Sequence, residues 1–96
     1  MGLQILEDKC TIGENQGKIV IQTDEPDGYK ARKLLENAET RRLAQQFAAS
    51  KGLSQPGING TVQIYPVDID GKEITNPKKQ KIAFFYAEVP IQRSIM

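Results

Sequence analysis

The chain has 96 residues, of which 26% are charged, and its formal net charge at pH 7 is only +1. This length suits one domain, which we expect to span residues 1–96, and the near-neutral charge gives no bulk attraction to nucleic acid or to a membrane. The chain contains no histidine and one cysteine, Cys10. The commonest general base and transition-metal ligand are therefore missing, and no intrachain disulfide can form.

These absences argue against an enzyme, and we expect neither a metal site nor a cofactor. The pairs of carboxylates in the sequence show no sign of the burial that shifts a pKa into a working range, and no glycine-rich segment has phosphate-loop spacing. The start of the chain is too short and too acidic for a signal peptide, and no apolar run approaches the roughly 18 residues that cross a bilayer. We therefore expect a cytoplasmic protein without a membrane partner.

Residues 3–23 are predicted to form strands. Residues 3–5 alternate between apolar and polar side chains, and 10–12 and 18–23 form the two arms of a hairpin around a turn at 14–17. This turn places Cys10 on the side that faces the core. We therefore expect Cys10 to be a small buried hydrophobic residue rather than a reactive thiol.

The segment 26–52 is predicted to be the main helix. Asp24 or Asp27 can cap its start, and Gly52 after Lys51 matches a glycine C-cap. At ~100° per residue, however, the apolar side changes partway along the helix. The first half groups four apolar residues, Ala31, Leu34, Leu35 and Ala38, and the second half groups four on the opposite side, Leu43, Ala44, Phe47 and Ala48.

Two structures account for this change of side. The helix can break near 37–40, where Asn37 and Thr40 are suitable N-caps. It can also stay continuous and contact two surfaces, which the good helix formers around Glu39 favour, and this is the preferred prediction. The second surface would then be a loop, the C-terminal tail or another chain.

The second half of the chain returns to strands. Residues 53–60 are predicted to form a loop, and 61–69 a strand that either lies at a sheet edge or breaks at Pro66. Asp70 and Gly71 are typical of a tight hairpin, and 76–81 form an exposed basic loop.

Residues 82–89 are apolar on both faces, which indicates a central strand or a strand at an interface, and Pro90 is expected to end it. Ile91, Ile95 and Met96 follow and are available for packing. The order of elements predicts an α+β fold: a small antiparallel sheet in ββαββ-type order, with one main helix, whether or not it breaks near 37–40, packed on one face.

The surplus of apolar surface favours a protein-binding or adaptor module that forms a homodimer. The candidate interface residues come from the helix and the last strand: Leu43, Phe47, Ala48, Phe85, Ala87 and Val89. The alternative is a nucleic-acid-binding protein that uses its basic residues, Arg41, Arg42, Lys78, Lys79 and Lys81. This alternative requires the two basic groups to share one surface, and it predicts binding that weakens steeply with salt.

Overall fold

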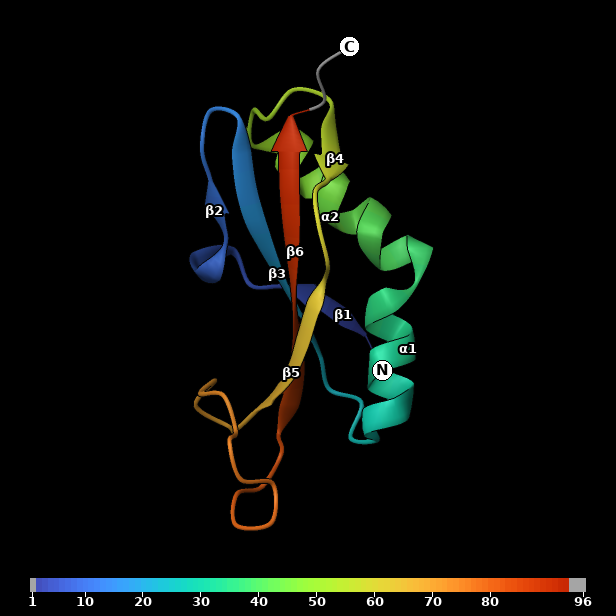
Figure 1. Ribbon diagram of the computed structural model, residues 1–96, viewed down its shortest axis with the longest axis vertical. Coiled ribbons are helices and arrows are strands. Elements are labelled where there is room, and N and C mark those ends of the chain that lie inside the picture. Colours follow the sequence, from blue (N-terminus) through green and yellow to red (C-terminus); the bar gives the residue numbers. More distant parts are fainter. Residues whose placement is uncertain (1, 94–96) are drawn as a thin grey trace.

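The computed structural model describes residues 2–93, which form an antiparallel sheet with two helices on one face (Figure 1). The strands are β1 (Leu3–Ile5), β2 (Thr11–Ile12), β3 (Gln16–Thr23), β4 (Pro56–Ile58), β5 (Gln63–Val67) and β6 (Phe84–Arg93). The helices are α1 (Gly28–Glu36) and α2 (Ala38–Ser50), and a short 3-10 helix, η1 (Glu7–Lys9), connects β1 to β2. The predicted α+β class is confirmed.

β3 and β6 form the centre of the sheet and pair antiparallel over their length. On each side of this central pair, two short strands take the place of one long strand. β1 and β2 pair in turn with β3, while β4 and β5 pair in turn with β6 (Figure 1). The prediction that the strand after residue 81 is central is confirmed. Its end was predicted wrongly, because β6 continues through Pro90 to Arg93.

Pro90 is tolerated inside a central strand because of its position in the ladder. Its carbonyl accepts a hydrogen bond from the Asn59 N–H at 2.9 Å. Pro90 therefore directs its backbone away from β3, towards the interruption between β4 and β5. No strand carbonyl faces Pro90 on that side, so the N–H that proline lacks is not needed. Proline therefore does not break the sheet.

The first hairpin turns one residue earlier than the sequence predicts. The Gly13 N–H donates to the Gln16 carbonyl at 2.7 Å, and β3 begins directly after this turn. Gly17 belongs to the strand, where it pairs with Ile12, and a Cβ at this position would lie 2.5 Å from the carbonyl oxygen of Thr11. The glycine permits close backbone approach and is not a turn residue.

The preferred prediction of a continuous helix is wrong, because the chain bends at Asn37. This residue has extended backbone angles (φ −66°, ψ 148°), and its side chain accepts a hydrogen bond from the Glu39 N–H at 2.9 Å. Thr40 is buried, and its hydroxyl donates to the Leu34 carbonyl at 2.7 Å. These two polar contacts stabilise the bend and outweigh the helix propensity of the neighbouring residues.

The bend explains why the apolar side changes. Each helix turns its own apolar side towards the same face of the sheet. The apolar residues of both helices therefore pack into one core. Its buried members come from both helices, the central strands and the loop after α2: Ile19, Ile21, Ala31, Leu35, Ala44, Ala48, Leu53, Phe85, Ala87, Val89 and Ile91. Ile95 and Met96, whose packing was left open, lie outside the described residues.

The other face of the sheet carries a smaller cluster of Val20, Val67 and Tyr86. Chain segments rather than helices cover it. Leu6 packs against the cluster, and a Cβ at Gly71 would lie 2.8 Å from the Tyr86 hydroxyl oxygen. The turn after β5 therefore folds back over β6, which is covered on both faces.

Candidate protein-binding groove

Four of the six predicted interface residues lie inside the core of the chain. Ala48, Phe85, Ala87 and Val89 are buried where the helices meet the sheet. They cover one another within one molecule, so they offer no accessible surface to a partner. The physical reason is the bend at Asn37, which turns the second apolar helix side onto the sheet.

The other two predicted residues stay half-buried at the surface. Leu43 lines a hollow beside Leu3 and Leu34. Phe47 lies under the Lys51 ammonium group, which is 5.4 Å from the ring centroid. These two positions therefore remain accessible to a partner.

The two basic groups of the alternative prediction lie in different parts of the molecule. Arg41 and Arg42 are exposed near the start of α2, whereas Lys78, Lys79 and Lys81 are exposed in the loop between β5 and β6. The start of α2 lies near the middle of the long axis and that loop lies at one end (Figure 1). The fold does not bring the two groups together on one surface.

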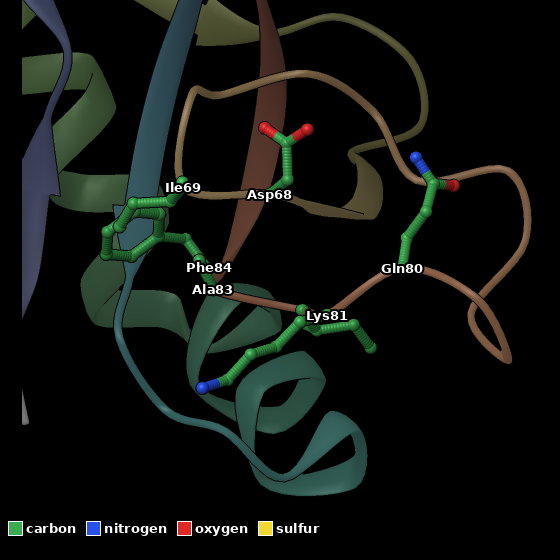
Figure 2. A pocket seen from close by; sticks show the side chains of 7 residues that line it. Asp68, Ile69, Gln80, Lys81, Ala83 and Phe84 are labelled. Carbon is green, nitrogen blue, oxygen red and sulfur yellow. The ribbon is translucent and has the colours of Figure 1, made fainter.

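A groove of about 720 Å³ lies at this same end of the molecule. Its lining is mostly apolar, from Ile69, Ile82, Ala83 and Phe84, with polar groups from Asp68, Gln80 and Lys81. Figure 2 shows Ile69 and Phe84 towards one end of the groove and Gln80 towards the other. Ile69 is 75% exposed, the highest exposure among the large apolar side chains of residues 2–93.

The turn that carries Ile69 is held by hydrogen bonds around Asp68. The Asp68 carboxylate accepts from the backbone N–H groups of Asp70 (2.9 Å) and Lys72 (3.0 Å), and the Asp68 N–H donates to the Lys72 carbonyl (2.9 Å). Gly71 has φ +83°, which suits the left-handed position at the end of such a turn. A hairpin forms at the predicted place, but its loop contains Ile69 as well as Asp70 and Gly71, because Asp68 bonds to Lys72 and Val67 pairs with Glu73. This geometry holds Ile69 out of the core.

The opposite wall is anchored as well. The Ala83 N–H donates to the Val67 carbonyl at 2.9 Å, which ties the start of β6 to the end of β5. The loop before it is closed by Asn76, whose side chain accepts from the Lys78 N–H at 3.2 Å. Within residues 2–93, neither Lys78 nor Lys81 takes part in an ion pair.

The sheet face next to the groove holds a polar contact in a partly buried setting. The Tyr65 hydroxyl donates to the Glu88 carboxylate at 2.5 Å, and the Lys18 ammonium lies 3.6 Å from the other carboxylate oxygen. Burial, followed by the hydrogen bond to Glu88, raises the pKa of Tyr65 above its usual range. Tyr65 therefore stays neutral and acts as a hydrogen-bond donor rather than as a base.

Cys10 is held in a structural setting. Its thiol donates to the Leu6 carbonyl (3.2 Å) and accepts from the Val20 N–H (3.3 Å). Burial raises the pKa of the Cys10 thiol, which disfavours the thiolate that a nucleophile needs. The residue is half-buried between the two apolar clusters, so it packs as a small apolar side chain.

Within the described part of the chain, no group of three or more Cys, Asp or Glu side chains could hold a metal ion. Among residues 2–93 no helix has the length and apolar character that a membrane span requires. Comparison with protein-family models, curated proteins and solved structures finds no match to this chain.

Proposed function

We propose that the chain is a small, non-enzymatic protein-binding module that takes an apolar segment of a partner protein into the groove beside Ile69. The observation that carries this proposal is the exposure of Ile69 on a turn that hydrogen bonds hold in place. Ile69 borders a groove whose other apolar lining comes from Ile82, Ala83 and Phe84, so a partner that covers it would remove a continuous apolar surface from water. Because the turn is already ordered, binding would cost little conformational entropy.

The charges around the groove indicate the chemistry of the partner. Lys81 lines the groove, and the adjoining loop adds Lys78 and Lys79, while no acidic residue occurs between positions 74 and 87. Asp68 lies on the other wall, but its carboxylate is engaged by backbone N–H groups. We therefore propose a partner segment in which aliphatic or aromatic residues are flanked by acidic ones, so that its charges complement the lysines.

The predicted homodimer would be a second protein contact of the same module. We place the module in the cytoplasm, because the lone thiol of Cys10 fits a reducing compartment. Both statements are independent of the groove and require their own tests.

A displayed library of random peptides tests the groove directly. Peptides selected on the wild-type chain are expected to combine apolar with acidic residues. Ile69→Ser should weaken the binding of a selected peptide at least about tenfold, because it removes the exposed anchor. Tyr29→Ser is the matched control, since Tyr29 is the other exposed large apolar side chain among residues 2–93 and does not line the groove. Titration calorimetry measures each affinity.

Two results would overturn this function. Selected peptides that bind wild type and Ile69→Ser equally would place the contact elsewhere. Tight binding of a single-stranded oligonucleotide that falls steeply with salt and is lost in the triple variant K78E/K79E/K81E would favour nucleic acid instead. Enrichment of apolar, acidic peptides that compete with one another for the Ile69 surface supports the proposal.

A further inference from the structure

The outer edge of β1 is open for pairing. The Leu6 N–H donates to the Val20 carbonyl at 2.9 Å, which fixes the alternation of hydrogen-bonded pairs between β1 and β3. Gln4 then directs its backbone groups towards β3, whereas Leu3 and Ile5 direct theirs away from the sheet. Within residues 2–93 no hydrogen bond to a loop or turn engages these outward groups.

The sequence of β1 lacks two features that protect other edges of this sheet. On the far side of the sheet, both edge strands contain proline, and the Pro66 carbonyl is already occupied by the Ile74 N–H at 2.9 Å. β1 has neither proline nor a charged side chain. Because β1 has only three residues, a strand that pairs with it must also contact the neighbouring side chains.

The register of β1 is self-complementary. A two-fold axis at Gln4 would place Leu3 of one copy opposite Ile5 of the other. Because both residues point their backbone groups outward, each such pair can exchange its N–H and C=O groups. The two Gln4 residues would face each other as a non-hydrogen-bonded pair. This fits their geometry, because the N–H and C=O groups of Gln4 already point towards β3 in each copy. One symmetric arrangement would thus satisfy all the outward groups of Leu3 and Ile5.

A hollow of about 540 Å³ with a mixed apolar and polar lining borders this edge. Leu3, Leu34 and Leu43 line it and are half-buried. Leu34 belongs to α1 and Leu43 to α2, and the bend at Asn37 brings both to the end of β1. A partner strand placed beside β1 would cover these leucines on the helix-covered side of the sheet.

The charges at the hollow favour a second copy as the occupant. Glu39 and Arg42 line the same hollow, and within the described residues neither forms an ion pair. A patch with one carboxylate and one guanidinium is complementary to itself about a two-fold axis, because each group can face its opposite on the partner. The net charge of +1 opposes self-association only weakly.

We propose that the β1 strand of a second copy of this chain pairs antiparallel with β1 about a two-fold axis at Gln4. The hollow beside Leu3, Leu34 and Leu43 completes the interface, together with contacts between Glu39 of one copy and Arg42 of the other. The two sheets would join into one, with the helices of both copies on the same face. This surface depends on the self-association proposed above and leaves the groove at Ile69 free.

A charge swap tests the interface. Sedimentation of the wild-type chain at micromolar to high micromolar concentration should give about twice the chain mass of 10.7 kDa. Glu39→Arg and Arg42→Glu should each weaken dimerisation at least about tenfold, because like charges then meet across the axis. The double variant E39R/R42E should restore dimerisation. A purely structural role for either residue would not produce this rescue.

A backbone variant tests the strand pairing. Ile5→Pro removes an outward N–H without removing a bond to β3, so it should yield a folded monomer. Circular dichroism checks the fold, and the charge swap decides the matter if this variant does not fold. A monomeric wild type overturns both the interface and the self-association. If the chain dimerises and Glu39→Arg, Arg42→Glu and Ile5→Pro all leave its dimerisation unchanged, this interface alone is overturned. Neither a monomeric wild type nor such a dimer bears on peptide binding at Ile69.

Discussion

The two faces of the sheet are covered in different ways. On one face two helices pack on the central strands, and Ile19, Ile21 and Ala87 are fully buried. On the other face Val20 and Tyr86 are buried beneath η1, the residues around it and the turn after β5. The first covering is made of regular helices, whereas the second is made of short segments.

Polar contacts contribute more to the second face. The Tyr65–Glu88 hydrogen bond and the Lys18–Glu88 ion pair lie on it, and the Lys9 ammonium lies 6.0 Å from the centroid of the Tyr86 ring. The turn that covers this face also carries Ile69, the anchor of the proposed groove. The comparison teaches that the helix-covered face holds the larger apolar core, whereas the smaller cluster on the second face lies under a turn that leaves Ile69 exposed.

The largest effect is expected on the helix-covered face. Leu35→Ala should lower the free energy of unfolding by about 2–5 kcal/mol, because Leu35 is fully buried and its truncation leaves a cavity. Leu34→Ala, next to it on the same helix but half-buried, should cost less than about 1.5 kcal/mol. Urea unfolding measures both. Equal losses would contradict the packing of α1 described here.

A smaller effect is expected from the turn that covers the second face. Gly71→Ala should cost about 2 kcal/mol, because φ is +83° and the new Cβ would lie 2.8 Å from the Tyr86 hydroxyl oxygen. Gly52→Ala is the matched control: φ is +103°, but no atom lies within 4 Å of the new Cβ, so backbone strain of about 1 kcal/mol acts alone. Thermal unfolding compares them. If Gly52→Ala were the more harmful, the turn would not pack on Tyr86.

The smallest effect concerns the pH dependence of the second face. Tyr65→Phe should cost about 0.5–1.5 kcal/mol at neutral pH through loss of the hydrogen bond to Glu88. The pKa of folded Tyr65 is raised above its ordinary value of 10.0. Its contribution is therefore fully present below pH 10 and is lost as pH rises from there towards the folded pKa. Unfolding free energies measured from pH 9 upwards should fall less steeply for Tyr65→Phe, and parallel curves would contradict this.

Local patterns in the sequence predict much of the fold. Strand alternation, the Asp70–Gly71 turn and the apolar residues of 82–89 lead to an antiparallel sheet with a central last strand, because these signals depend on neighbouring residues alone. The same reasoning misjudges Pro90 and the helix at Asn37. At Pro90 the neighbouring strands decide, and at Asn37 the capping side chain and the buried Thr40 hydroxyl decide.

The candidate sites follow the same division. The sequence identifies the lysines of the basic loop and the apolar residues of the last strand. It predicts Phe85, Ala87 and Val89 to lie at an interface with a partner, whereas the structure buries them in the core of the chain. It gives no signal that Ile69 would be exposed, because an isoleucine in a strand pattern is expected to be buried.

The sequence by itself determined the α+β class, the approximate places of the two hairpin turns and the absence of histidine chemistry. Only the tertiary structure decided which apolar residues are covered. Periodicity defines the side of an element on which a residue lies, whereas burial depends on which distant segment packs there. The bend at Asn37 turned the second helix side inward, and the turn at Asp68 left Ile69 outside.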